Sequence, residues 1–215
     1  MSEQRNDGLL GVGLRALKGG AVVVALAVDQ DEPRILLSTF LATHDAGDRL
    51  SLEPYGVAAG MPRGPDGKAS AEAAAAVAQG RARQDRLATR GLQDIVQQLG
   101  RPERDKLIAA LVVNRAGWVT DLLDYSLAWA DHVPVAEGLA VREALRFGVQ
   151  RCRIDMIELD EKSLPDLVEK TLGLSSTEVA SRLKDLGAAA GRPWRKEQKA
   201  ACLAAWIGSV SAFQI

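Results

Sequence analysis

The sequence predicts an α/β protein with a mixed five-stranded sheet flanked by helices. Three strand-like runs at the start are joined by two tight turns, which makes them neighbours in an antiparallel meander. Two later apolar runs are linked through helical segments, and the crossover rule makes such strands parallel neighbours. With 215 residues, 47% of them hydrophobic, the chain can bury a sizeable core. We expect residues 9–215 to form one domain after a flexible N-terminus, 1–8.

The first three strands are expected within the first 43 residues. Paired glycines after Lys18 supply the positive φ angles of a hairpin turn, and the residues QDEP at 30–33 form the second turn. The middle run is valine-rich, which is typical of a strand buried on both faces. The three strands are placed at 9–17, 21–29 and 34–43.

The stretch 44–69 shows no clear hydrophobic period and contains Gly, Pro and Asp. It predicts an extended loop, either a plain exposed excursion or a binding loop. Ser70 then caps a long helix that Gly100 and Pro102 end near Leu99. The outer face of this helix carries a basic stripe, which either is simply solvated or contributes to binding; it consists of Arg83, Arg86 and Arg90.

The second half of the chain alternates helices with two strands. A continuous apolar run predicts a central strand at 106–116, and alternation with acids predicts a peripheral strand at 153–160. Ser175 and Glu178 form a capping box, and Gly187 is expected to end that helix. The remaining helices are expected at 119–129 with Thr120 as cap, at 136–150, at 166–172 after Pro165, and from Pro193 onwards.

This order of elements is similar to the ribonuclease H-like fold, and within it the chain resembles the Holliday-junction resolvases. The first hairpin carries part of the resemblance, with LLGVG at 9–13 followed by Gly19, Gly20 and the valine-rich strand. The strand 107–114, the helix ending at Cys152 and the strand 154–159 carry the rest. The resemblance spans about Leu9 to Trp206 and rests on element order and apolar pattern.

The chemistry departs from what the resemblance implies. Such nucleases hold two divalent cations, about 4 Å apart, with carboxylates from the first strand, the fourth strand and a C-terminal helix. The corresponding first-strand position is Gly13, and the fourth strand offers Val113 or Asn114. The last helix has Glu197 near its start, and its later positions are Ala200, Ala201 and Ala204. The resemblance therefore supports the scaffold and argues against metal-dependent cleavage.

A basic segment precedes and opens the last helix, which the resemblance places beside the active cleft. A helix start favours anions, basic side chains add charge, and an aromatic ring can stack on a base. The alternative is a solvated helix face with Trp194 packed as a lid. The predicted nucleic-acid-binding residues of this segment are Arg192, Trp194, Arg195, Lys196 and Lys199.

Further polar residues stand at the ends of the first and fourth strands. Arg15 and Lys18 end the first, and Asn114 and Arg115 follow the fourth, where open sheets tend to bind ligands. If they converge, they form a cationic cleft suited to a phosphate or carboxylate; the alternative is ordinary charge at strand ends.

The leading hypothesis is therefore a non-catalytic ribonuclease H-like protein that binds nucleic acid and needs no cofactor. One alternative is a Mg- or Mn-dependent nuclease with an unusual carboxylate set, for which the candidates are Asp29, Asp160 and Glu197. Another is a protein–protein interaction module.

Composition excludes several other classes. A net charge of −1 argues against a bulk polycation, and two cysteines with two histidines exclude a disulfide framework and a multi-cysteine zinc site. No run is long and apolar enough to cross a bilayer, and the polar start MSEQRNDG lacks a signal core. We expect a cytoplasmic, bacterial-type protein with no membrane contact, and a homodimer is compatible with the sequence.

Overall fold

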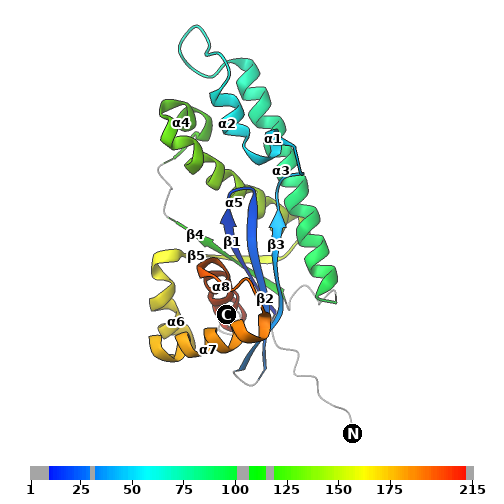
Figure 1. Cartoon of the computed structure of the whole chain (residues 1–215), viewed down its shortest axis with the longest axis vertical. Helices are drawn as coiled ribbons and strands as arrows, with labels where there is room; N and C mark the ends of the chain where they lie inside the picture. The colour runs from blue at the N-terminus through cyan, green and yellow to red at the C-terminus, as the bar shows by residue number, and fades with distance from the viewer. Residues whose placement is uncertain (1–9, 30–31, 101–106, 115–118, 212–215) are drawn as a thin grey trace.

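The computed structural model describes residues 10–29, 32–100, 107–114 and 119–211 (Figure 1). Its centre is a five-stranded sheet with the order β3-β2-β1-β4-β5. The strands are β1 (Leu10–Leu17), β2 (Gly20–Asp29), β3 (Glu32–Ala42), β4 (Leu107–Val113) and β5 (Asp155–Asp160). β1, β2 and β3 pair antiparallel, whereas β4 is parallel to both β1 and β5. The predicted mixed sheet, with a central fourth strand and a peripheral fifth, is confirmed.

Helices cover both faces of this sheet (Figure 1). One layer contains α3 (Ala71–Gln98) and α5 (Val133–Cys152), and the other contains α6 (Leu164–Leu172), α7 (Ser176–Ala190) and α8 (Lys196–Ser211). Alternation along β1 sorts its side chains between the two layers. Val12, Leu14 and Ala16 join the core under α3 and α5, so Gly11, Gly13 and Arg15 point towards α8.

A helical extension rises beyond the sheet at the top of Figure 1. It contains α1 (Arg49–Leu52), α2 (Pro54–Ala59) and α4 (Leu122–Ala128), packed against α3 and α5 around a small core that includes Tyr55 and Val77. The predicted extended loop at 44–69 is therefore partly wrong. Its two helices have four and six residues, too few to display a hydrophobic period, although Pro54 stands at the first helical turn as helix starts favour.

Several predicted helix ends are confirmed and two need correction. Ser70 caps α3, and Ser175 with Glu178 forms the capping box of α7. Asp121, not Thr120, caps α4, because its carboxylate accepts the amides of Leu123 and Asp124. Gly187 does not end α7, which continues to Ala190. Short 3-10 turns lie at Ala130–His132 and Glu161–Ser163.

Across the described ranges, no helix is long and apolar enough to cross a membrane. Cys202 is fully buried in α8, and Cys152 packs half-buried against the core under α5.

Candidate nucleic-acid interface

The carboxyl ends of β1, β4 and β5 meet at one edge of the sheet. The registers pair Arg15 with Val112 and Val113 with Asp160, so Arg15, Asn114 and Glu161 follow one another across this edge. The predicted convergence of Arg15 and Asn114 is thereby explained, because parallel strands bring their carboxyl ends together.

Glu161 is the acceptor at the centre of this group. Arg15 Nη2 lies 2.9 Å from Glu161 Oε2, and both side chains are about four-fifths buried. Lys196 Nζ, from the first turn of α8, lies 3.6 Å from Glu161 Oε1. With its amide oriented to satisfy both of its polar atoms, Asn114 donates to Glu161 Oε2 at 2.9 Å. The carboxylate is thus held by three donors from three different elements.

Arg142 of α5 adds a third cation from the opposite layer. Its Nη1 donates to the Asn114 carbonyl at 3.3 Å, while its buried Nε has no hydrogen-bond partner. Burial lowers the pKa of Arg142, and the nearby cations Arg15 and Arg146 lower it further. We call Arg15, Asn114, Arg142, Glu161 and Lys196 the edge cluster; in it three cations face one carboxylate.

Behind the edge, α8 packs directly on β1 with no side chain between the two backbones. A Cβ atom at Gly13 would lie 1.8 Å from the Ala201 carbonyl oxygen, and one at Gly11 would lie 1.9 Å from that of Ala205. Because real Cβ contacts are never this short, glycine is required at both positions. These contacts also show that α8 runs antiparallel to β1, so α8 begins near the carboxyl end of β1.

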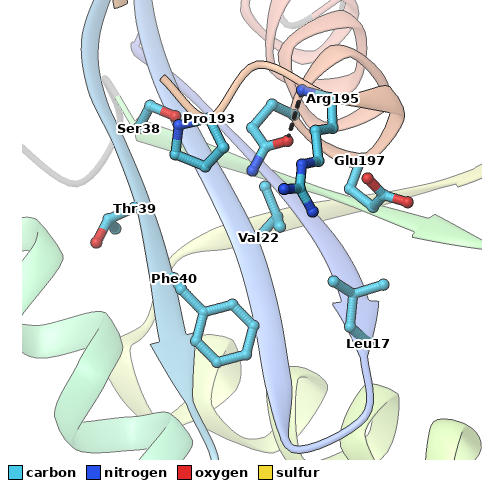
Figure 2. A pocket seen from close by; sticks show the side chains of 9 residues that line it. Leu17, Val22, Ser38, Thr39, Phe40, Pro193, Arg195 and Glu197 are labelled. Atoms are coloured by element: carbon cyan, nitrogen blue, oxygen red, sulfur yellow. Dashed lines mark hydrogen bonds between the residues drawn. The ribbon is translucent and has the colours of Figure 1, made fainter. Parts of the chain in front are cut away.

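The start of α8 borders an open pocket of about 530 Å³ on the same face of the sheet (Figure 2). Arg195 precedes the helix; its backbone N–H donates to Gln198 Oε1 at 2.9 Å, and its carbonyl accepts from Lys199 N–H. The pocket is lined by Leu17, Val22, Ser38, Thr39, Phe40, Pro193, Arg195, Glu197 and Gln198.

The four cations of the basic segment (Arg192, Arg195, Lys196 and Lys199) are all exposed around the start of α8. Trp194 differs from them. It is half-buried, its Nε1 donates to the Leu183 carbonyl at 2.9 Å, and its ring lies against Gly187, where a Cβ atom would come within 2.3 Å of the indole. This packing explains why α7 passes through Gly187 instead of ending there.

The other predicted residues are not gathered at the edge. Lys18 pairs with Glu53 at 2.9 Å, and Arg115 lies outside the described residues. Asp29 ends β2 beyond the amino end of β1, at the opposite edge of the sheet from Asp160. Asp160 accepts the Lys162 amide at 2.9 Å, and Glu197 lines the pocket.

These positions do not fit a pair of divalent cations. Of the places where the resemblance implies ligands, Gly13 and Ala201 are in backbone contact, and Asn114 is engaged with Glu161. In the part of the chain that the structure describes, no three Asp, Glu, His or Cys side chains are grouped as metal ligands. The edge suits an anion instead, since its three cations outnumber the one carboxylate at its centre.

Three residues of this site were not singled out by the sequence. Arg142 reaches the edge only because α5 crosses behind it, which no local pattern reveals. Phe40 and Gln198 look like ordinary strand and helix residues, and only the sheet register and the start of α8 bring them to one pocket. Glu161 directly follows the predicted strand at 153–160, and only the tertiary fold brings it between Arg15 and Lys196.

Comparison with known proteins identifies the fold. No protein family and no curated protein matches the sequence. Among solved structures, Thermus thermophilus RuvC, alone and in complex with a Holliday junction substrate, matches with a TM-score of 0.54 at 10% identity, covering 96% of both chains. The yeast mitochondrial Holliday junction resolvase Ydc2 matches with a TM-score of 0.44 at 11% identity over 94% of this chain and 81% of Ydc2. The chain has the ribonuclease H-like fold of Thermus thermophilus RuvC.

Proposed function

We propose that this protein binds nucleic acid through the edge cluster and the basic segment, without cleaving it. The observation that carries the proposal is the composition of the sheet edge. Three cations stand there with one carboxylate, which is paired with Arg15 and Lys196, and the other exposed cations around the start of α8 lie close by. Lys196 belongs to both groups and joins them into one continuous surface.

This surface has the chemistry that phosphate groups require. Lysine and arginine neutralise phosphates, and the start of a helix presents a positive dipole end to the same side. α8 has sixteen residues, long enough for this dipole to count. The solved complex of Thermus thermophilus RuvC contains a Holliday junction substrate, which supports nucleic acid as the class of partner.

We expect no cleavage because other groups occupy the positions where the resemblance implies metal-binding carboxylates. Clamping the attacking and leaving phosphate oxygens with two metal ions needs several carboxylates around one point. Contact between α8 and β1 leaves no room for a side chain at Gly13, and Asp29 and Asp160 lie at opposite edges of the sheet. The one carboxylate at the centre of the edge is neutralised by Arg15 and Lys196.

The proposal also keeps three expectations from the sequence. The protein acts as one domain over 9–215, it works in the cytoplasm of a bacterial-type cell, and it functions as a monomer or a homodimer. Light scattering measures the assembly, and limited proteolysis tests whether the domain is cleaved only near its start.

Fluorescence anisotropy with labelled single-stranded, duplex and branched DNA at several salt concentrations tests the binding. A variant that combines Arg192→Gln, Arg195→Gln, Lys196→Gln and Lys199→Gln is expected to bind at least about tenfold more weakly and to show a shallower salt dependence, because each lost phosphate contact removes released counterions. The matched control neutralises four exposed cations elsewhere, through Arg86→Gln, Arg90→Gln, Lys170→Gln and Lys184→Gln.

The control is expected to bind like the unaltered protein. Equal losses in the two variants would contradict a site at the start of α8. Binding that does not respond to salt, or no binding to any of the three DNAs, would remove the proposed function.

A further inference from the structure

The pocket at the start of α8 combines an exposed aromatic ring with polar and cationic groups. In Figure 2, Val22 lies on the floor between Phe40 on one side and Arg195 on the other. Leu17 and Pro193 add further apolar walls, and Ser38 adds a hydroxyl. A site of this kind suits a flat, partly apolar group that is attached to a negative charge.

Phe40 is exposed because of its place on the edge strand. It stands opposite Val22 in the register, so its side chain points to the face of the sheet that α8 covers. The helix lies over β1, β2 and β4 and not over β3, so it leaves Phe40 uncovered, and the residue surface of Phe40 is 48% exposed. Gly20 lies beneath the ring, since a Cβ atom there would come within 2.7 Å of Phe40 Cζ. The ring is therefore supported on one side and open to solvent on the other.

Trp194 does not compete for this role. Its indole N–H is bonded to the Leu183 carbonyl and its half-buried ring is packed against Gly187, so one face of the ring is occupied by the protein, although Trp194 also borders a separate open pocket beside Arg192. Among the exposed large apolar side chains of the described residues, which are Phe40, Trp129, Val135 and Phe147, only Phe40 lines a pocket together with Arg195.

Gln198 gives the pocket a fixed hydrogen-bond donor. The residue is nine-tenths buried, and its Oε1 is occupied by the Arg195 backbone N–H. None of the described residues accepts from its Nε2, and this atom is not one of the buried side-chain atoms left without a partner, so it is open to water in the pocket. A ligand can replace that water and accept from Nε2.

We propose that this pocket takes one unpaired nucleobase, stacked on Phe40, while the neighbouring phosphate lies at Arg195 and Lys196. Gln198 Nε2 then donates to an acceptor on the base edge. This inference rests on the proposed function and narrows it to single-stranded segments, because a base inside a duplex is already paired and stacked and cannot enter.

A single strand that carries one 2-aminopurine tests the inference, because stacking quenches the fluorescence of this base. The unaltered protein is expected to quench it and to bind the single strand more tightly than a blunt duplex of equal length. Phe40→Ala is expected to lose the quenching and about tenfold in single-strand affinity, since stacking contributes about 1–3 kcal/mol per base. Duplex affinity is expected to change less than about twofold.

Three further variants separate stacking from folding. Phe40→Trp is expected to restore quenching and affinity, because it keeps an aromatic face. Gln198→Glu keeps an oxygen for the Arg195 N–H but replaces the donor, and is expected to weaken single-strand binding. Trp194→Phe keeps a packed ring and is expected to leave quenching unchanged.

The possible failures are distinguishable. If Phe40→Ala quenches and binds single strands like the unaltered protein, or if Trp194→Phe alone abolishes quenching, the inference is overturned, while the salt-dependent loss in the four-cation variant still upholds the proposed function. If the unaltered protein binds no DNA at all, both are overturned.

Discussion

The two helical layers differ in where their charged side chains lie. In the layer of α8, the helix backbone touches β1 at Gly11 and Gly13, which excludes side chains from the middle and confines cations to the exposed start of the helix. In the layer of α3 and α5, some charged groups are buried between helices, and Glu137 is the most buried of them. Charge that water can reach is available to a ligand, whereas buried charge is committed to the fold.

Glu137 of α5 is the clearest example of a buried carboxylate whose contacts stabilise the fold. Only 4% of the residue is exposed, its Oε1 accepts the Gly56 amide at 2.8 Å, and its Oε2 is buried without a partner. The carboxylate thereby ties α5 to the first turn of α2. Burial raises the pKa of Glu137 to about 7, and the amides of Gly56 and Tyr55 offset this only in part.

The same layer holds a buried arginine with its own partners. Arg81 Nη2 lies 2.7 Å from Glu143 Oε2, and Arg81 Nη1 donates to the Tyr55 hydroxyl at 3.2 Å. Nearby, burial raises the pKa of Asp85, whose Oδ1 has no hydrogen-bond partner. These groups shape the helical extension, and none of them lines the pocket at α8.

The largest effect is expected where α8 meets β1. Gly13→Ala adds a Cβ atom 1.8 Å from the Ala201 carbonyl oxygen, so α8 must move off the sheet. We expect a loss of about 3 kcal/mol or more in the free energy of unfolding, measured by urea denaturation. Gly13→Asp should destabilise the protein at least as much. That result would show that the position is filled by backbone contact and is not a metal site that only lacks its carboxylate.

Gly138→Ala in α5 is the matched control. Nothing lies within 4 Å of the added Cβ atom, so the substitution is expected to stabilise the helix by about 0.5–1 kcal/mol. A Gly13→Asp protein as stable as the unaltered one would show that the two backbones are not in close contact.

The next largest effect is a pH dependence of the free energy of unfolding, which arises in the layer of α3 and α5. Because the folded pKa of Glu137 is raised from 4.5 to about 7, folding favours the protonated form. The free energy of unfolding should therefore fall as the pH rises through this window, by about 3 kcal/mol in total. Glu137→Gln removes this fall, so the variant should gain stability relative to the unaltered protein between pH 4.5 and 8.

Glu178 supplies an internal control with the opposite sign. Hydrogen bonds from Ser175 lower its pKa, so its contribution is present above pH 4.5 and is lost as the pH falls. Denaturation at several pH values should show the slope disappearing in Glu137→Gln and persisting in Glu178→Gln. An unchanged slope in Glu137→Gln would show that this carboxyl is not buried in its charged form.

The smallest effect is expected in the edge cluster. Glu161→Gln frees Arg15 and Lys196 from their carboxylate partner, so DNA affinity should rise by roughly three- to tenfold at low salt. Glu158→Gln is the matched control, because Glu158 of β5 pairs with Arg146 of α5 and not with Arg15 or Lys196. Anisotropy titrations measure both, and weaker binding by Glu161→Gln would contradict the surface that we describe.

The sequence predicts the architecture well because its signals are local. The valine-rich β2, the turn at Lys18 and Gly19, and the capping box at Ser175 each depend on neighbouring residues; of the two glycines predicted to have positive φ, only Gly19 has it, and Gly20 begins β2. The two short helices between 44 and 69 escape detection, because Asp48 and Pro54 mark helix starts but no period follows them. Gly187 predicts a helix end, whereas α7 continues through it and the ring of Trp194 packs against it.

The candidate site is predictable only in part. Arg15 and Asn114 could be placed at one edge, because parallel strands align their carboxyl ends. The partnership of Arg142 with that edge depends on how α5 crosses the sheet, and the exposure of Phe40 depends on which strands α8 covers. These features depend on tertiary packing and cannot be recognised from local sequence patterns.

The central claim is that this ribonuclease H-like protein binds nucleic acid without cutting it. The most direct test incubates end-labelled single-stranded, duplex and branched DNA with the protein and Mg²⁺ or Mn²⁺, and measures binding and cleavage in the same samples. We predict salt-sensitive binding, with the DNA intact in either metal and with Asp160→Asn indistinguishable from the unaltered protein. Metal-dependent cleavage that Asp160→Asn abolishes would contradict the account.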